Sequence, residues 1–387
     1  MKQAKISFLV VVLLFASVLV SCVPGGAQAA RGWSGTAFHD GIVYAGSADG
    51  RVVAVDAATG SLKWHYPITA PSGGGLSCGP AAVSAAIYTT PIVEGDLVYV
   101  GTYTAQGGRM YALRISDGQI IWEYPRGGAY IGAIVGTPVI AGESIYFSSS
   151  DGRVYALDRS SFTLDWSSEQ LADKLWTSPA VVGDTVYVST LDGHIHALSA
   201  ETGEPLDWSF ESQTGFASAP VVYEDIIYVG SFDNNLYAVR IGASEPLWRF
   251  AGGKWFWAAP LVSHGIVYAG CLDGRIYAID AETGEGLWQF ESKDAKGRRV
   301  PIVSSPYLVD NLLILVNEAG TVHVFDLGDD PVAEPAALKT ISIGADVRGS
   351  FSAHEGLVYI RDEKNRLNAV DIDRGVVDWM IPLTGEE

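Results

Sequence analysis

The chain has 387 residues, enough for two or three average domains, and its formal net charge at pH 7 is −19. This acidity argues against nucleic acid as a partner and against direct adhesion to anionic lipid. No group of His and Cys residues has metal-ligand spacing, so we expect no metal site.

The N-terminal segment reads as an export signal. Lys2 and Lys5 precede an apolar run, residues 6–20, which is short for a membrane span. Leu19-Val20-Ser21-Cys22 then resembles the lipobox of bacterial lipoproteins, and the resemblance implies cleavage before Cys22 and lipidation of that residue. We therefore predict a lipoprotein signal peptide at 1–21 and a lipid-anchored tether at 22–34. An ordinary signal cut after Ala27 or Ala29, or an uncleaved anchor, is the alternative, and every version places the remainder outside the cytoplasm.

The rest of the chain is a repeat. Short segments with similar sequences open eight copies, at residues 35–37, 89–91, 136–138, 177–179, 218–220, 258–260, 304–306 and 349–351. Their mean spacing is about 45 residues, the length of one four-stranded propeller blade. We predict an all-β, eight-bladed β-propeller over residues 35–383 with a short tail at 384–387.

Each copy predicts a four-stranded antiparallel meander. In the sixth copy, strand-length runs occupy residues 261–262, 266–270, 275–280 and 286–290. Asp273-Gly274 lies between the second and third runs, where Asp-Gly favours a tight hairpin turn. The Asp residues at this position therefore need no calcium to explain them, and none is followed by the spacing of an EF-hand loop.

Aromatic residues recur at two positions of the repeat. Tyr recurs in the second strand and Trp in the fourth, at Tyr44, Tyr99, Tyr146, Tyr187, Tyr228, Tyr268 and Tyr359, and at Trp64, Trp122, Trp166, Trp208, Trp248, Trp288 and Trp379. We interpret both as packing residues between blades. The seventh copy has residues 313–315 and 338–340 in these places and is a degenerate blade. Cys78 and Cys271 belong to copies that are not neighbours in the ring, which argues against a disulfide between them.

Other aromatic and basic residues lie outside the two recurring positions, in the loops that precede the inner strands. We expect these loops to share one face of the ring and to form a partner-binding surface, because interface hot spots favour Trp, Tyr and Arg. About half of the aromatics are expected to cap blade ends instead. The candidates are Tyr88, Tyr130, Trp176, Phe216, Trp255, Phe256, Trp257, Arg298, Arg299 and Arg348.

The repeat pattern in residues 40–64 and 260–288 resembles that of PQQ-like propellers, over nearly the whole mature chain. Two groups share this pattern: quinoprotein dehydrogenases and lipoproteins of the BamB type, which the resemblance implies are non-enzymatic scaffolds of outer-membrane barrel assembly. The dehydrogenases have an adjacent cysteine pair and a calcium site, and this chain has no adjacent cysteines and no Asp or Glu in a general-base context. We therefore expect no enzyme activity and neither PQQ nor calcium.

The BamB-type resemblance implies a protein partner at the cell envelope, bound through loops before neighbouring inner strands. The matching loop holds Leu171, Lys174 and Trp176, with Lys174 in place of the family's Arg, and the next loop, residues 214–217, lacks the family's acids. The sequence thus predicts an extracytoplasmic lipid-anchored scaffold, facing the periplasm from the outer membrane or lying on the outer face of the cytoplasmic membrane. A quinoprotein-like enzyme and a glycan-binding propeller are the alternatives.

Overall fold

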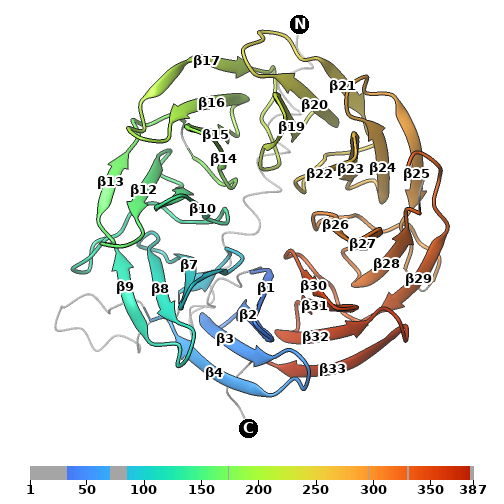
Figure 1. The fold of residues 1–387 in the computed structure, drawn as a ribbon, viewed down its shortest axis with the longest axis horizontal. Coiled ribbons are helices and arrows are strands. Elements are labelled where there is room, and N and C mark those ends of the chain that lie inside the picture. The colour runs from blue at the N-terminus through green and yellow to red at the C-terminus, as the bar shows by residue number, and fades with distance from the viewer. Residues whose placement is uncertain (1–32, 70–84, 173, 295, 329–330, 384–387) are drawn as a thin grey trace, which may run out of the picture.

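The computed structural model describes residues 33–69, 85–172, 174–294, 296–328 and 331–383. It is an all-β ring of eight antiparallel sheets, each a propeller blade, arranged around a central axis (Figure 1). The predicted fold class and blade number are confirmed. Cys22, Cys78, the signal segment and the tail lie outside the described residues. The described part contains no helix long and apolar enough to cross a membrane.

The strands follow one another from the inside of each blade to its outside, except that β5 and β6 of blade 2 both pair with β7. Blades 1 to 4 contain β1 (Thr36–His39), β2 (Ile42–Gly46), β3 (Arg51–Asp56) and β4 (Leu62–Pro67); β5 (Ala86–Ile87), β6 (Ile92–Glu94), β7 (Leu97–Tyr103), β8 (Met110–Arg114) and β9 (Ile120–Tyr124); β10 (Val139–Ala141), β11 (Ser144–Ser148), β12 (Val154–Asp158) and β13 (Leu164–Ser167); and β14 (Ala180–Val182), β15 (Thr185–Ser189), β16 (His194–Ser199) and β17 (Pro205–Glu211). Blades 5 to 8 contain β18 (Val221–Tyr223), β19 (Ile226–Gly230), β20 (Asn235–Arg240) and β21 (Trp248–Ala251); β22 (Leu261–Ser263), β23 (Ile266–Gly270), β24 (Arg275–Asp280) and β25 (Gly286–Glu291); β26 (Tyr307–Val309), β27 (Leu312–Val316), β28 (Thr321–Asp326) and β29 (Ala337–Ser342); and β30 (Ser352–His354), β31 (Leu357–Arg361), β32 (Arg366–Asp371) and β33 (Val376–Pro382).

The first blade opens one residue earlier than the sequence spacing suggested. Ala37 pairs with Tyr44 as Val139 pairs with Tyr146, so Thr36 occupies the position that proline fills in most other copies. Ser34 is buried and accepts a hydrogen bond from the Gly46 N–H at 3.0 Å. Ser34, placed at the end of the tether by the sequence pattern, thus packs as part of blade 1.

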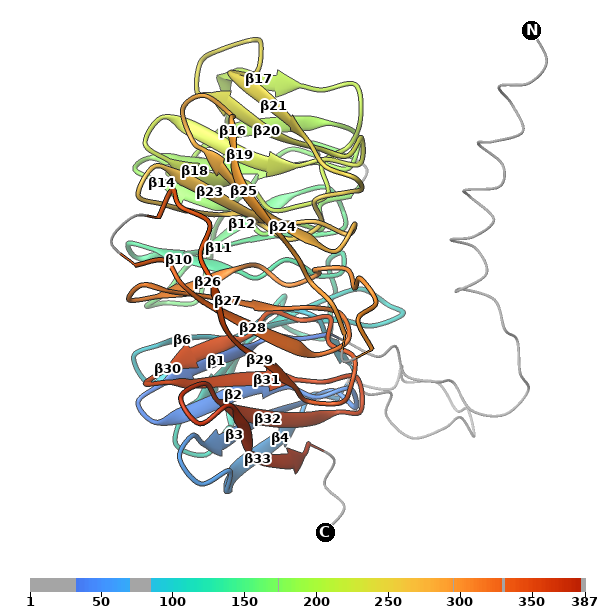
Figure 2. The ribbon, with the colours of Figure 1, turned by 90° about the vertical axis from the view of Figure 1, so that its right-hand side faces the viewer.

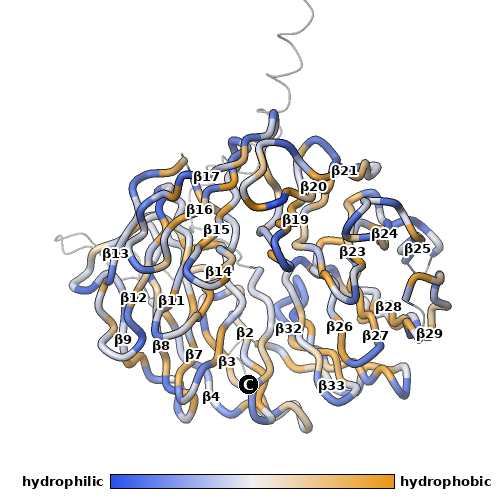
Figure 3. The backbone as a smooth tube through the Cα atoms, turned by 45° about the horizontal axis from the view of Figure 1, so that its top comes forward, coloured by the Kyte–Doolittle hydropathy of each residue, from blue (hydrophilic) through white to orange (hydrophobic). Residues whose placement is uncertain are grey.

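The core lies between the blades. The described residues form eight buried apolar clusters, one at each interface between neighbouring blades, including that between blades 8 and 1. Between blades 5 and 6, for example, Tyr228 and Leu236 pack against Val267 and Tyr277. Hydrophobic stretches accordingly follow the strands, while many of the connecting turns are hydrophilic (Figure 3). A single blade buries little by itself and needs both neighbours.

The recurring Trp of each outer strand hydrogen-bonds to the next blade. The Trp248 indole N–H donates to the Ala281 carbonyl at 2.9 Å, and the Tyr228 hydroxyl donates to the same oxygen at 3.0 Å. Gly284 of that turn has a φ of +74° and lies under the indole, where a Cβ would be 2.5 Å from Trp248 Cγ. The equivalent indole bonds are Trp64 to Ile115, Trp122 to Phe162, Trp166 to Ala200, Trp208 to Ala243, Trp288 to Pro331 and Trp379 to Ala57.

Blade 7 departs from this pattern where the sequence predicted. Ile314 and Lys339 pair with Val324 as Tyr44 and Trp64 pair with Ala54, so they occupy the Tyr and Trp positions. The Lys339 ammonium donates to the Asp373 carbonyl of blade 8. A lysine therefore makes the polar contact to the next blade without covering it with an aromatic ring.

The ring closes through side chains rather than through a shared strand. The sheets of blades 1 and 8 are separate. Thr36 Oγ1 lies 3.0 Å from Ser352 Oγ and donates to the Tyr359 carbonyl at 2.8 Å, and the Trp379 indole donates to Ala57. The closing interface thus uses the same tryptophan contact as the other interfaces that carry the recurring Trp.

The first prediction concerns the indole bonds. Trp248→Phe keeps an aromatic ring but leaves the Ala281 carbonyl with only the Tyr228 donor. The free energy of unfolding should fall by roughly 1 kcal/mol for the lost hydrogen bond, and further because the smaller ring buries less apolar area. Urea denaturation monitored by circular dichroism measures this loss. Trp257→Phe, at a side chain that is 38% exposed, is the matched control and should change stability by less than about 0.5 kcal/mol. Equal effects of the two variants would contradict the structural role of Trp248.

The second prediction concerns a buried histidine in blade 7. His323 Nε2 lies 3.1 Å from Ser292 Oγ, which also accepts from Asn317 Nδ2 at 2.9 Å, and burial lowers the His323 pKa from 6.5 to about 4. Between these values the unfolded chain binds a proton that the folded chain does not. The free energy of unfolding should therefore decrease as pH falls from 6.5 to about 4. Below that range His323 should cause no further decrease. His323→Gln should show a smaller decrease over the same range in denaturant titrations, and parallel curves for both proteins would refute this.

Candidate functional site

The loops that lead into the inner strands share one face of the ring with the turns between the second and third strands. The Phe232 N–H donates to the Gly215 carbonyl at 3.0 Å, and the Leu272 N–H donates to the Trp255 carbonyl at 3.0 Å. Ser150, Glu318 and Glu363 repeat this contact with the loops before their own blades. We call this surface the top face; it forms one flat side of the ring, which Figure 2 shows edge-on. The predicted clustering of these loops is therefore present in the structure.

The top-face loops alternate between buried and exposed side chains. Four residues before the proline position the side chain is apolar and fully buried in seven of the blades, at Ile87, Ile134, Leu175, Phe216, Phe256, Ile302 and Val347. Its backbone N–H often bonds the preceding blade, as Phe216 bonds the Thr190 carbonyl at 3.0 Å. Phe216 and Phe256 are thus core residues, and the proposal that they contact a partner is corrected.

The next residue in each loop is exposed or half-buried in seven of the blades, and only Ala217 is buried there. The eight residues in this position are Trp33, Tyr88, Val135, Trp176, Ala217, Trp257, Val303 and Arg348. Trp33, Trp176 and Trp257 are 37%, 42% and 38% exposed. Successive side chains of an extended segment point to opposite sides, which explains the switch from buried to exposed. We call these eight residues the rim.

Two aromatic clusters form on the top face. Trp33 meets Tyr88 edge to face, with ring centroids 4.5 Å apart, and Tyr88 also lies 5.9 Å from Tyr103. Phe232 meets Trp255 at 5.0 Å and Trp257 at 6.4 Å, both edge to face. Burial, followed by the charge of Tyr103, raises the pKa of Tyr88. All these rings are at least partly exposed, so their free edges are available to a ligand.

Trp33 and Phe232 were not among the predicted site residues. Trp33 stands three residues before Thr36, the same spacing as Trp257 before Pro260, and correct alignment of the first copy would have found it. Phe232 precedes the Asp233-Asn234 turn, where other copies carry Ala48, Ser150 or Glu318. A large aromatic residue at that turn position was the sequence signal that could have identified Phe232 as a surface residue.

The loop before blade 4 contributes an exposed pair. Lys174 Nζ lies 5.8 Å from the Trp176 ring, within reach of a cation–π interaction. Leu171 is partly buried against the cluster between blades 3 and 4. Trp176 and Lys174 are therefore exposed as predicted, whereas Leu171 has a large part of its surface in the core.

Tyr130 is held by a buried arginine. The Arg109 guanidinium lies 4.3 Å over the Tyr130 ring, pairs with Glu123 at 3.0 Å and donates to the Ala129 carbonyl at 2.8 Å. Arg109 is 3% exposed. The ring of Tyr130 therefore secures the loop before blade 3, and only part of it faces solvent.

The three predicted arginines are paired with acids on the top face. Arg298 bonds Asp294 at 2.6 Å, Arg299 bonds Glu291, and Arg348 lies 3.4 Å from Glu363. The pKa of Asp294 is lowered, first by the backbone N–H of Arg298 and then by its guanidinium. These arginines remain exposed, so they can contact a partner from these positions.

The Asp residues of the hairpin turns already have protein donors. Asp273 accepts from the Tyr277 hydroxyl at 2.7 Å and from the backbone N–H groups of Arg275 and Gly253 at 3.0 and 3.1 Å. These bonds lower the pKa of Asp273, although its burial acts in the opposite direction and is the largest effect, and the pKa of Tyr277 rises to about 12. Within the described residues, no three His, Cys, Asp or Glu side chains group together as metal ligands.

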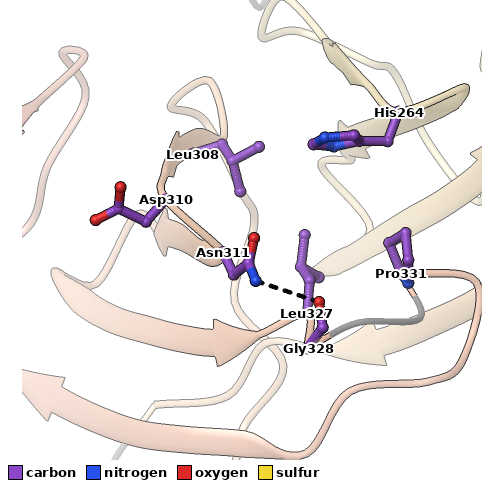
Figure 4. Close-up of a pocket in the computed structure, with 7 residues that line it drawn as sticks. All are labelled: His264, Leu308, Asp310, Asn311, Leu327, Gly328 and Pro331. Carbon is purple, nitrogen blue, oxygen red and sulfur yellow. Dashed lines mark hydrogen bonds between the residues drawn. The ribbon is translucent and has the colours of Figure 1, made fainter.

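A pocket of about 250 Å³ lies on the opposite face, between blades 6 and 7 (Figure 4). His264 lines it from blade 6, and Leu308, Leu327 and Pro331 line it from blade 7. The His264 ring points toward the blade 7 residues, while the Asp310 carboxylate points away from them (Figure 4). The acid and the base are thus not aimed at a common point. Cys271, a free buried thiol, donates to the Lys254 carbonyl at 3.2 Å, and burial raises its pKa to about 11.

Known proteins similar to this chain fall into more than one functional class. The outer membrane protein assembly factor BamB of Shewanella oneidensis is 28% identical over 148 residues, 38% of this chain and 34% of that protein. The quinohemoprotein alcohol dehydrogenase ADH IIB of Pseudomonas putida is 40% identical over 86 residues, 22% of this chain and 11% of that protein. The chain thus matches about a third or less of each relative's own length.

The solved structure of BamB from Moraxella catarrhalis has the same fold. It superposes with a TM-score of 0.62 at 18% identity and covers 92% of this chain and 95% of that one. The sequence model of the family described as outer membrane protein assembly factor BamB matches residues 23–86, 79–207 and 192–385. The chain therefore belongs to the BamB family of PQQ-like β-propellers.

Proposed function

We propose that this protein is a non-catalytic scaffold of the cell envelope that recruits a protein partner through the top face, in outer-membrane protein assembly. The observation that carries the proposal is the position of the tryptophans. Seven of the eleven join neighbouring blades, and the other four, Trp33, Trp176, Trp255 and Trp257, all lie in top-face loops. Tryptophan that is not used for stability and is exposed on one face is typical of a protein interface.

The BamB family supports both the class of partner and the location. Its relatives carry names that place them in assembly of outer-membrane proteins. We propose that Cys22 is lipidated and tethers the propeller at the outer membrane facing the periplasm, or on the outer face of the cytoplasmic membrane. The charge of −19 keeps the blades themselves off an anionic bilayer.

The third prediction tests the top face. Trp176→Ala combined with Trp257→Ala should abolish capture of an envelope partner from detergent-solubilised membranes, because both exposed anchors are lost. The melting temperature should change by less than about 2 °C, since neither side chain is in the core. Affinity capture with protein identification and calorimetry give the two measurements.

Leu164→Ala combined with Leu338→Ala is the matched control. These leucines are 41% and 53% exposed on the outer strands β13 and β29, so the variant removes similar apolar surface away from the top face. It should retain capture. Retained capture by the tryptophan variant, or a fall in its melting temperature like that of Phe256→Ala, would refute the proposal.

The fourth prediction separates a scaffold from a quinoprotein. With added PQQ, Ca²⁺ and a redox dye, the purified protein should reduce no more dye than a heat-denatured sample when alcohols or sugars are supplied. The reason is that the turn Asp residues are bonded to the protein's own donors, as at Asp273. Turnover in this assay would overturn the non-catalytic assignment.

A further inference from the structure

The top face carries a group of cations although the protein as a whole is acidic. Six basic residues lie in the loops before blades 6 and 7 and in the β23–β24 turn and the start of β24, namely Lys254, Arg275, Lys293, Lys296, Arg298 and Arg299. We call them the cationic sector. Three carboxylates pair with it, Asp273, Glu291 and Asp294. Even with the bordering Asp233 and Glu318 counted, the sector stays positive in a chain whose net charge is −19.

The cationic sector and the aromatic cluster adjoin at one turn. Gly253 donates to Asp273 at 3.1 Å, and the Trp255 carbonyl accepts from Leu272 at 3.0 Å. On the other side, the Arg299 side chain covers Gly274, where an added Cβ would lie 2.4 Å from Arg299 Cγ. Phe232, Trp255 and Trp257 therefore stand next to the arginines across a single hairpin.

One carboxylate at the centre of the sector is shared by three cations. Glu291 Oε1 accepts from Arg275 Nη2 at 3.1 Å and also from Arg299 Nη2, and Oε2 lies 3.2 Å from Lys293 Nζ. Each guanidinium can bind a carboxylate with two N–H groups, so this sharing leaves donors unused. Among the described residues, Lys254 and Lys296 pair with no carboxylate at all. The sector thus has room for further carboxylates from outside the chain.

We propose that the cationic sector and the Phe232, Trp255 and Trp257 cluster together bind an acidic polypeptide segment that carries a large apolar side chain. The partner's carboxylates would join the guanidinium and ammonium groups around Glu291, and its apolar residue would pack on the exposed aromatic edges. The inference rests on the proposed function, because it assigns a chemistry to the partner that the top face recruits.

Charge and ring geometry favour a peptide over the other anionic ligands. An extended anionic bilayer would also meet the carboxylates that border the sector, such as Asp233 and Glu318, in a chain whose net charge is −19. Sugars stack on flat ring faces, whereas Phe232 meets both tryptophans edge to face at 86° and 62°. An aromatic or apolar side chain packs well against such edges, and Arg and Trp are enriched at protein interfaces.

The fifth prediction uses a fluorescein-labelled peptide of six Glu and two Phe, and fluorescence anisotropy as the measurement. Lys254→Glu combined with Lys296→Glu should weaken binding about tenfold, since two exposed cations become repulsive. Arg126→Glu combined with Lys364→Glu is the matched control. It makes the same change of net charge at exposed top-face residues outside the sector and should weaken binding less than about twofold. A peptide with Lys in place of Glu should not bind.

The outcomes separate this inference from the proposed function. Equal weakening by both double variants would show attraction to overall charge only and would overturn the inference. It would also fail if polygalacturonate or phosphatidylglycerol vesicles bound the sector and the peptide did not. If the tryptophan variant lost its envelope partner while the acidic peptide bound nowhere, the scaffold function would stand and the acidic-segment inference would be refuted.

Discussion

The structure depends on one contact, in which the outer strand of a blade reaches the turn of the next. An indole N–H meets a backbone carbonyl there, and in several blades a tyrosine hydroxyl meets the same oxygen, as at Ala281. The glycine of that turn is required twice, because its φ is positive and because the indole covers the place of a Cβ. This contact adds a hydrogen bond to the apolar surface that neighbouring blades share.

Because stability comes from the interfaces, every blade must present matching contact residues to both neighbours, and its sequence at those positions can vary little. Blade 7 shows how much departure the ring tolerates, since Lys339 replaces the indole and still donates to blade 8. Its neighbouring interface compensates with a buried cluster that includes Ile314, Val347 and Phe351. The ring therefore closes without a specialised strand, as the contacts of Thr36 and Trp379 show.

The fold could be predicted from the sequence because its signals repeat. The Tyr and Trp positions appear in seven of the eight copies and the Asp-Gly turn in four, so a copy that departs from the pattern can be aligned through the others. The top-face loops were harder, because hydrophobicity indicates that an aromatic ring gains from burial but not which side of the loop it occupies. Phe256 and Trp257 are adjacent and both aromatic, yet one is fully buried and the other is exposed. Only the register to Pro260 distinguishes them, and that register requires the strand pairing.

The alternation in those loops has a consequence for how such a protein can diversify. The buried residue fixes the loop to its blade, while its neighbour at the rim is exposed or half-buried everywhere except at Ala217. Seven side chains, the rim without Ala217, are thus presented around one axis, and the exposed ones among them can be exchanged at little cost to the ring. In a propeller of this kind, substitutions at the rim can change which partner is bound while the fold stays the same.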